Sequence, residues 1–361
     1  MPVNQAPMSF SRRALVASFL VVPSLAAALI VGCGDDDNGS VPKPDGGVAD
    51  ASVPETSPPD VTVVDAGPDA AVVARGKYLV DHVAACGDCH TPRLQNGAPD
   101  MSRYLAGVDC FVDANGPEDA GCLSSANLTN HPTGLANASD AEIKTMFLDG
   151  KRPDGRFLVS VMPYYVLHNM KAEDADAIVA YLRTLPGVEH VVRPNEAPFN
   201  VVPAAATPID PATIPAADGG AAENGRYLAT MVGVCLECHT PELPIGSPTP
   251  IDMTKPFGGG REFPAAALGL PSPPFPETIR SSNITPHATG INGWSTADIV
   301  RVIKQGKDQS DAGVCPPMPA GPMGAFGGLT DQDALDIATY ISGLPPVNNA
   351  IQGGNGSCQA P

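Results

Sequence analysis

The sequence predicts an all-α fold made of two tandem domains of short helices. Three observations predict it: a set of motifs occurs twice in the same order, helix-capping patterns stand at matching places in both copies, and no strand run of comparable quality is found. The chain has 361 residues, with 37 Gly, 40 Pro and only 5% aromatic residues. Because few aromatic side chains are available, we expect something else to help fill the cores.

The charge of the chain excludes one function class. The net charge is −18, from 21 Lys and Arg against 39 Asp and Glu, and no basic run occurs. A nucleic-acid-binding protein needs a basic patch or stripe, so this class is excluded. A protein partner with a basic docking face is consistent with the charge.

The first 32 residues are typical of a bacterial lipoprotein signal peptide. Arg12 and Arg13 precede an apolar run at 14–31, which Pro23 interrupts, and the residues that end at Cys33 are similar to a lipobox. A transmembrane anchor is the alternative, but the run has only 18 residues and an acidic stretch follows it. We therefore expect lipidation of Cys33 and a membrane-anchored protein of the periplasm or cell envelope.

Residues 33–71 are predicted to be a disordered acidic tether, because 34–71 contain nine acidic residues, one Lys and no helical period. Repeated blocks then define the domains. Residues 76–79 and 86–92 match 225–228 and 235–241, residues 127–134 match 283–290, and residues 180–186 match 339–345. The sequence thus predicts a first domain at 72–193, a Pro- and Ala-rich linker at 194–222, a second domain at 223–347 and a C-terminal tail at 348–361.

Each domain is expected to contain three helices or more. The first helix ends in a Cys motif, and the middle helices run from Ser139 to Gly150 and from Ser295 to Gly306, between a capping residue and a glycine stop. The last helix of the first domain spans about 173–185. Its counterpart starts near 330 and places Ile337, Ile341 and Leu344 on one face.

The repeated Cys-x-x-Cys-His motif indicates covalent attachment of haem c. Two thiols at i and i+3 lie on one side of a helical turn, where both can bond the porphyrin, and the following His can bind the iron. A thioredoxin-type site lacks its βαβ context, and a zinc site of four Cys leaves both His without a role. The sequence therefore predicts two haem c groups, held by Cys86, Cys89, Cys235 and Cys238, with His90 and His239 as iron ligands.

The second axial ligand of each iron is expected to be a methionine. Met162 and Met318 each precede Pro in an irregular loop between the middle and last helices. Met323 is the alternative to Met318. When residues are counted back from the last helix, neither methionine aligns with Met162 unless an insertion or a deletion is allowed. His168 is the alternative to Met162.

The remaining His and Cys residues are expected to have structural roles. His131 and His287 are equivalent through the repeat, and we expect hydrogen bonds within their loops or a place near a haem propionate. His82 and His190 are expected at the surface or in packing. The simplest disulfides are Cys110–Cys122 and Cys315–Cys358, although four Cys allow three connectivities.

Residues 72–346 resemble two tandem class I cytochrome c domains, on the Gly-x-Tyr-Leu, Cys-x-x-Cys-His-Thr-Pro, Asn-(Leu/Ile)-Thr, Met-Pro and Tyr-(Leu/Ile)-x-x-Leu-Pro blocks. The blocks are similar to the cytochrome subunits of bacterial membrane-bound alcohol and gluconate dehydrogenases. The resemblance implies His/Met-ligated haems that pass electrons from a dehydrogenase to a respiratory acceptor. The chain departs from the pattern by having two Cys motifs where three are common, and by His131 and His287 where Asp is common.

Two function classes follow from these features. The first is an electron carrier with no substrate and no catalytic residue of its own. The second is a dihaem enzyme of the peroxidase or thiosulfate dehydrogenase type, which needs an iron with an open or displaceable site. The first is favoured, because each copy offers a Met ligand and no other catalytic constellation occurs in the sequence.

Overall fold

The computed structural model describes residues 69–95, 97–113, 121–202, 204–244, 247–268, 270, 275–352 and 357–358. Cys33, the signal peptide and residues 33–68 of the tether lie outside these ranges. Residues 64–361 form one compact unit, and the fold is that of this unit. In the described ranges, no helix is long and apolar enough to cross a membrane.

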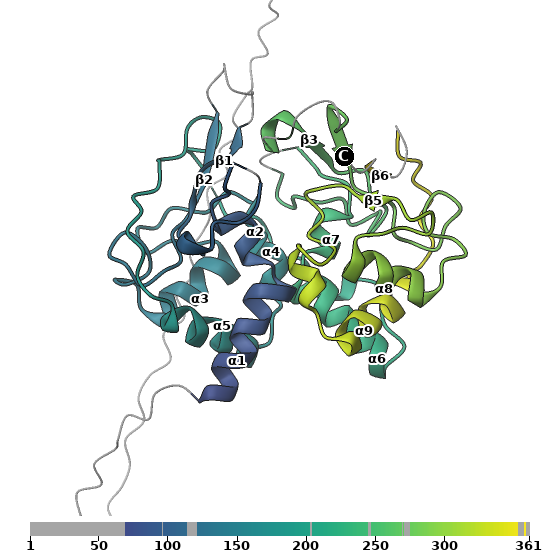
Figure 1. The fold of residues 1–361 in the computed structure, drawn as a ribbon, viewed down its shortest axis with the longest axis horizontal. Helices are drawn as coiled ribbons and strands as arrows, with labels where there is room; N and C mark the ends of the chain where they lie inside the picture. The colour runs from purple at the N-terminus through teal and green to yellow at the C-terminus, as the bar shows by residue number, and fades with distance from the viewer. Residues whose placement is uncertain are drawn as a thin grey trace, which may run out of the picture. The chain divides into compact units, whose positions relative to one another are not determined.

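The unit contains two copies of one helical arrangement, the first from 69 to about 202 and the second from about 204 onward (Figure 1). The helices of the first copy are α1 (Ala70–Tyr78), a π-helical turn η1 (Leu79–Val83), α2 (Cys86–His90), η2 (Met101–Arg103), α3 (Asp140–Asp149), α4 (Tyr164–Leu167) and α5 (Ala172–Thr184). Those of the second copy are η3 (Pro211–Thr213), α6 (Gly220–Tyr227), a π-helical turn η4 (Leu228–Val232), α7 (Cys235–Cys238), η5 (Ala266–Leu268), α8 (Thr296–Gln305), η6 (Ala325–Gly328) and α9 (Asp331–Ser342).

The capping patterns mark the helix starts correctly. Ser139 and Ser295 cap α3 and α8 in complete capping boxes, with Glu142 and Asp298 as the returning side chains. Both helices end where expected, at Gly150 and Gly306 in the left-handed conformation. The predicted middle helices are therefore found within a residue of their expected bounds.

The all-α prediction is only approximately right. Three short antiparallel pairs lie in the described ranges: β1 (Val108–Asp113) with β2 (Cys122–Ser125), β3 (Glu262–Pro264) with β4 (Thr278–Arg280), and β5 (Gly313–Val314) with β6 (Ser357–Cys358). The strands are two to six residues long. Strands this short carry too little hydrophobic alternation to be seen in a sequence.

The first helix of each copy is also not continuous into its Cys motif. The π-helical turns η1 and η4 follow α1 and α6, and Ala85 then adopts a positive φ of 52° before α2 starts. A π-helical turn inserts an extra residue into the helical ladder, which shifts the face that the following residues present. The spacing of hydrophobic residues in the sequence does not reveal this shift.

The linker packs against the rest of the unit. Ile209 and Ile214 are buried, and the backbone N–H of Ile209 donates to the carbonyl of Tyr165 at 2.9 Å. The Arg226 guanidinium donates to the carbonyls of Pro211 and Pro215. The Pro- and Ala-rich composition therefore forms an ordered strap in this unit, and α6 begins at Gly220 within the predicted linker.

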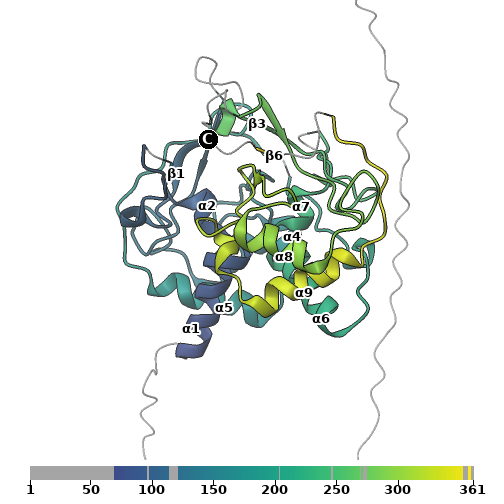
Figure 2. The same cartoon turned by 45° about the vertical axis from the view of Figure 1, so that its right-hand side comes forward.

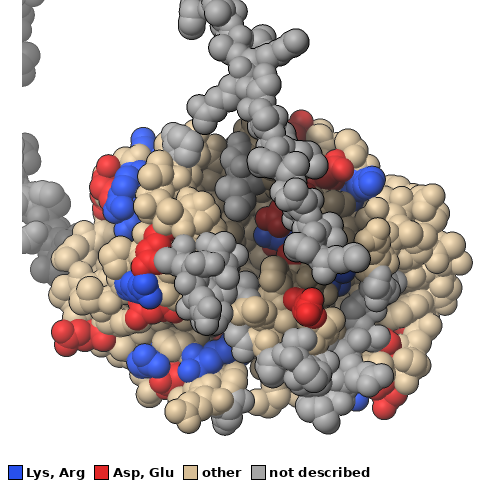
Figure 3. All heavy atoms as spheres, turned by 90° about the horizontal axis from the view of Figure 1, so that it is seen from above, with Lys and Arg blue, Asp and Glu red and all other residues tan. Residues whose placement is uncertain are grey.

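The surface of the unit carries charges of both signs. On the face shown in Figure 3, acidic and basic side chains stand next to one another among uncharged residues. Most of the ion pairs in the described ranges have at least one exposed side chain, such as Arg156 with Asp154 and Arg280 with Glu262. Pairs of this kind contribute little to stability.

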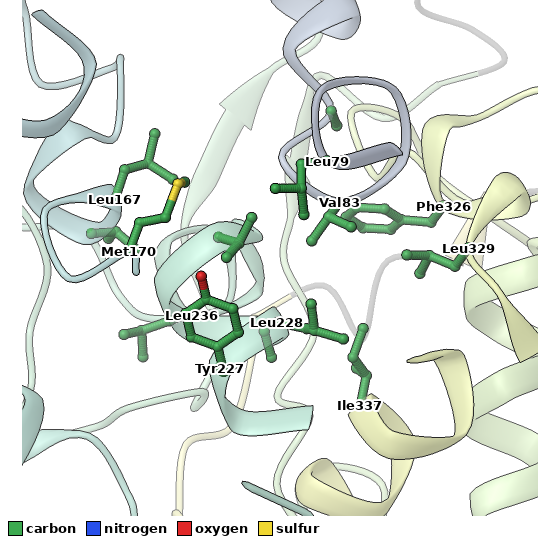
Figure 4. Packing of buried hydrophobic residues seen from close by; sticks show 14 of the residues in the cluster. Leu79, Val83, Leu167, Met170, Tyr227, Leu228, Leu236, Phe326, Leu329 and Ile337 are labelled. Carbon is green, nitrogen blue, oxygen red and sulfur yellow. The ribbon is translucent and has the colours of Figure 1, made fainter. Parts of the chain in front are cut away.

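The hydrophobic core is continuous between the two copies (Figure 4). Leu79 and Val83 of η1 lie next to Phe326 and Leu329 of the second copy, and on the other side Leu167 and Met170 lie near Leu236. The two copies therefore share one body of buried side chains. Figure 2 shows the helices of both copies from a second direction.

One glycine in each copy allows two helices to cross closely. α1 crosses α5 and α6 crosses α9, with Gly76 and Gly225 at the contacts. A Cβ atom at Gly76 would lie 1.8 Å from the carbonyl oxygen of Ala177, and one at Gly225 would lie 1.9 Å from that of Asp336. Only glycine allows the two backbones to approach this closely.

Replacing Gly76 or Gly225 with Ala is expected to lower the free energy of unfolding by about 3 kcal/mol, because the helices must separate to admit the methyl group. Urea unfolding followed by circular dichroism measures it. Gly343→Ala is the control, since its φ is −90° and a Cβ there would meet its nearest atoms at 3.6 Å, so a loss below about 0.5 kcal/mol is expected. Equal losses for all three variants would contradict this account of the crossings.

Candidate functional site

The Cys motifs occupy one-turn helices at equivalent places in the two copies. Cys86 and Cys89 lie on α2, and Cys235 and Cys238 on α7. All four are free cysteines, and burial raises the pKa of each thiol to about 12. Although each pair has the i, i+3 spacing, neither pair forms a disulfide, so both thiols of each turn are available to bond one ligand.

The imidazole that follows each pair is held by one hydrogen bond. The Nδ1 atom of His90 lies 2.8 Å from the carbonyl oxygen of Ala126, and Nδ1 of His239 lies 2.8 Å from that of Ser282. A carbonyl only accepts, so Nδ1 carries the proton and the lone pair is on Nε2. Burial lowers the pKa of both imidazoles, which keeps them neutral. A neutral imidazole with a fixed tautomer and a free Nε2 is the form that binds a metal.

A buried asparagine fixes the carbonyl that orients His90. Asn127 directly follows Ala126 and is 2% exposed. Its Oδ1 accepts from the backbone N–H and the hydroxyl of Thr129, at 2.9 and 2.7 Å, and its Nδ2 donates to the carbonyl of Val188 at 2.9 Å. The Asn127 side chain thus stabilises the turn that leads to Thr129 and bonds this turn to the segment after α5.

The second copy repeats this arrangement atom for atom. Asn283 follows Ser282, its Oδ1 accepts from the N–H and hydroxyl of Thr285 at 3.0 and 2.7 Å, and its Nδ2 donates to the carbonyl of Val347 at 2.8 Å. The sequence block Asn-(Leu/Ile)-Thr was recognised as a repeat, but its role was not predicted. Its place one residue after the accepting carbonyl explains why the block is present in both copies.

The backbone carbonyl of each histidine also accepts a hydrogen bond, at equivalent places in the two copies. The N–H of Gly107 donates to the carbonyl of His90 at 2.8 Å, and that of Gly259 to the carbonyl of His239 at 2.6 Å. Both glycines have positive φ, at 87° and 68°. The loop after each Cys motif therefore folds back and encloses its histidine.

Met162 and Met318 stand in equivalent turns. Each lies twelve residues after the glycine that ends the preceding helix, Gly150 or Gly306. In both turns the methionine N–H donates to the carbonyl three residues earlier, at 3.0 Å for Met162 and 3.1 Å for Met318. Counted forward from the glycine, Met318 therefore aligns with Met162 without an insertion or deletion. Counted back from the last helix, the two methionines do not align in this way.

The two candidate methionines of the second copy differ in exposure. Met318 is half-buried and packs against the core, as Met162 does, whereas the side chain of Met323 is 86% exposed. The extra residues of the second copy lie after Met318, in the turn that carries Met323. This placement favours Met318 as the counterpart of Met162.

The other predicted histidines have partners in the protein. Nδ1 of His131 contacts the hydroxyl of Thr133 at 2.8 Å, and Nδ1 of His287 contacts that of Thr289 at 2.9 Å. His168 lies at the surface beside Asp149, His82 contacts the carbonyl of Ala325, and His190 contacts that of Ala106. In the described residues these histidines thus contact groups of their own loops or of neighbouring segments.

The structure joins Cys110 and Cys122 by a disulfide with a Cα–Cα distance of 4.8 Å. Cys315 is also disulfide-bonded. Strand β6 pairs with β5 in a register that places Cys358 opposite Gly313, so the backbone of the tail runs beside Cys315. Cys33 lies outside the described residues.

These residues fit a covalently attached haem in each copy. Two free thiols share one helical turn, a neutral imidazole directs an unprotonated Nε2 away from its carbonyl partner, and a half-buried thioether follows in a turn of the same copy. In the described ranges no group of three or more His, Cys, Asp and Glu side chains forms a separate metal site. The chemistry is therefore concentrated at the two Cys motifs.

Comparison with known proteins gives a family match in the first copy. Residues 73–186 match the cytochrome c family model. The alcohol dehydrogenase (quinone) cytochrome c subunit of Gluconacetobacter polyoxogenes is 28% identical over 304 residues, 77% of this chain and 57% of that protein. The fructose dehydrogenase cytochrome subunit of Gluconobacter japonicus is 34% identical over 179 residues, 46% of this chain and 32% of that protein.

A third similar protein is the gluconate 2-dehydrogenase cytochrome c subunit of Pantoea cypripedii. It is 25% identical over 298 residues, which is 76% of this chain and 60% of that protein. This chain therefore spans less than two thirds of the length of each of these three relatives.

Asn127→Ala and Asn283→Ala are each expected to lower the free energy of unfolding by about 1–3 kcal/mol, because each leaves buried N–H, hydroxyl and carbonyl groups without a partner. Chemical denaturation measures the loss. Asn292→Ala removes an exposed asparagine of the second copy and serves as the control. If Asn292→Ala cost as much as the two buried changes, the proposed clamp would have no special role.

Proposed function

We propose, from the premise that residues 73–186 are a cytochrome c domain, that this chain is a dihaem cytochrome c. It carries electrons from a membrane dehydrogenase to a respiratory acceptor outside the cytoplasm. One observation carries the proposal: the Cys-x-x-Cys-His turn with its Nδ1–H to carbonyl hydrogen bond occurs twice, with the same distance of 2.8 Å in both copies.

Each copy holds one haem with its own residues. Cys86 and Cys89 form the thioethers in the first copy, and Cys235 and Cys238 in the second. The bound iron supplies a one-electron redox centre. His90 and His239 present Nε2 to it, and the carbonyls of Ala126 and Ser282 strengthen this donor by accepting from Nδ1.

The methionines complete the coordination in this proposal. Met162 and Met318 would provide the thioether sulfur that binds the iron, since they share one turn geometry and one degree of burial. A Met ligand raises the reduction potential relative to a second His. It also occupies the position that a peroxide or sulfur substrate needs. An electron carrier is therefore favoured over a dihaem enzyme.

The partners are proposed from the relatives and the signal sequence. Three relatives are named as cytochrome subunits of dehydrogenases for alcohol, fructose and gluconate, so the proposed donor is a membrane-bound dehydrogenase. Cys33 is the proposed lipid attachment point, and 33–71 the segment that connects it to the folded unit. The acidic charge of the chain suits a basic docking face on a partner.

The haem content tests the function. Expression with the haem-maturation machinery is expected to give a protein whose mass exceeds that of the polypeptide by two haems. Replacing Cys235 and Cys238 with Ser is expected to remove one haem, and the matched pair of changes at Cys86 and Cys89 the other. A protein that binds the same amount of haem after the Cys235 and Cys238 changes would contradict the proposal.

The second axial ligand of the second haem is tested by substitution. Met318→Ala is expected to change the absorption spectrum and lower the reduction potential of one haem only, because a weaker ligand replaces the thioether. Met162→Ala should do the same to the other haem. Met323→Ala is the control, and a spectral change there with none in Met318→Ala would exchange the two assignments.

A further inference from the structure

Two tyrosines cross from one copy to the other at equivalent places. Tyr78, at the end of α1, donates its hydroxyl to Oδ2 of Asp333 in the second copy at 2.5 Å. Tyr227, at the end of α6, donates to Oδ2 of Asp174 in the first copy at 2.6 Å. They are the same residue of the repeated Gly-x-Tyr-Leu block, so the contact is reciprocal.

Each hydroxyl is bonded to the start of the other copy's last helix. The N–H of Thr330, which caps α9, donates to the Tyr78 hydroxyl at 3.2 Å, and the N–H of Lys171, which caps α5, donates to the Tyr227 hydroxyl at 3.2 Å. The tyrosine thus bridges the N-cap N–H and the carboxylate three residues later. In α3 and α8 a side chain of the same helix makes this bond to the N-cap N–H.

The Arg75 side chain lies beside both contacts. The Arg75 guanidinium donates Nε to Oδ1 of Asp174 at 2.8 Å and Nη2 to Oδ2 at 2.9 Å. It also lies 5.8 Å from the centre of the Tyr78 ring. Its hydrogen bonds to Asp174 raise its pKa, and the charge of Asp333 adds to this rise. A bidentate Arg–carboxylate pair of this kind has a fixed geometry. Arg75 therefore holds Asp174 in place for Tyr227.

The second contact has no such cation of its own. The residue equivalent to Arg75 is Asn224, whose Nδ2 donates to Oδ1 of Asp333 at 3.2 Å and to Oδ2 of Asp336 at 2.7 Å. Both carboxylates that accept a tyrosine hydroxyl are therefore held by a second donor from the first helix of their own copy. The two donors differ in charge and in geometry, because Arg75 binds both oxygens of Asp174 whereas Asn224 donates to one oxygen each of Asp333 and Asp336.

We propose that this polar clasp, made of Tyr78, Tyr227, Arg75, Asp174 and Asp333, locks the two copies into one arrangement. Tyr78 and Tyr227 are then positioning residues for electron transfer between the two haems. This inference rests on the dihaem function proposed above. The tyrosines touch neither haem ligand, and act only by fixing how one copy faces the other.

The location of the clasp supports this role. Each tyrosine precedes a π-helical turn whose side chains enter the shared core, where Leu79 and Leu228 are almost fully buried. Because electron transfer slows steeply with distance, a small rotation of one copy would change the rate.

The test uses the full haem-loaded protein with Tyr78→Phe, Tyr227→Phe and both together. Phenylalanine keeps the ring in the core and removes only the hydroxyl. The double variant is expected to increase amide hydrogen exchange at the starts of α5 and α9 by about tenfold or more. It should also slow electron exchange between the haems after flavin photoreduction by several-fold, with both haem spectra unchanged.

Tyr104→Phe is the matched control, because its hydroxyl donates to Asp81 within the first copy and crosses no boundary. It is expected to leave the inter-haem rate unchanged. An unchanged inter-haem rate in the double variant, or an equal slowing in Tyr104→Phe, would overturn the inference. A protein with one haem would refute the dihaem function instead, and hydrogen exchange would still decide whether the hydroxyls hold the copies together.

Discussion

One hydrogen bond governs each candidate haem site, the one from imidazole Nδ1–H to a backbone carbonyl. It decides which ring nitrogen is free and where that nitrogen points. The carbonyl can do this only because the next residue, Asn127 or Asn283, is buried and bonded on both sides of its amide. A turn far from the Cys motif in sequence therefore sets the chemistry of the motif. In the proposed function the thiols would attach the haem, and the asparagine turn would orient the histidine that binds its iron.

The Gly-x-Tyr-Leu block shows how three residues can serve three levels of structure. Gly76 allows α1 to touch α5 within its own copy, Tyr78 bonds across to α9, and Leu79 enters the core that both copies share. In the second copy, Gly225 allows α6 to touch α9, Tyr227 bonds across to α5 of the first copy, and Leu228 enters the shared core. Because neighbouring residues on a helix point in different directions, one short block can fix the fold of a copy and its docking on the other.

The sequence predicted those features that depend on local chemistry. Helix starts at Ser139 and Ser295 follow from side chains that bond to nearby N–H groups, and the free thiols follow from spacing on one turn. What the sequence did not reveal depends on distant partners. The short strands, the π-helical turns and the packed linker are stabilised by contacts outside their own segments, and the crossing of Tyr78 and Tyr227 needs both copies to be in place. The sequence did not decide between Met318 and Met323 as the ligand. Only the folded turn shows that the Met318 side chain is half-buried and that the Met323 side chain is exposed.

The two copies have nevertheless diverged where their Cys motifs meet the protein. Between the two thiols the first copy has Gly87, against which the Tyr104 ring packs, and the second copy has Leu236, which is fully buried in the shared core. The neighbouring acid also differs in setting: Asp88 lies 4.0 Å from a half-exposed Arg93, whereas Glu237 forms a buried ion pair with Arg261. Charges removed from water act over longer distances than exposed ones. The duplicated scaffold therefore keeps the hydrogen bonds of His90 and His239 and varies the charges around them. Under the proposed dihaem function, this variation would give the two haems unequal reduction potentials.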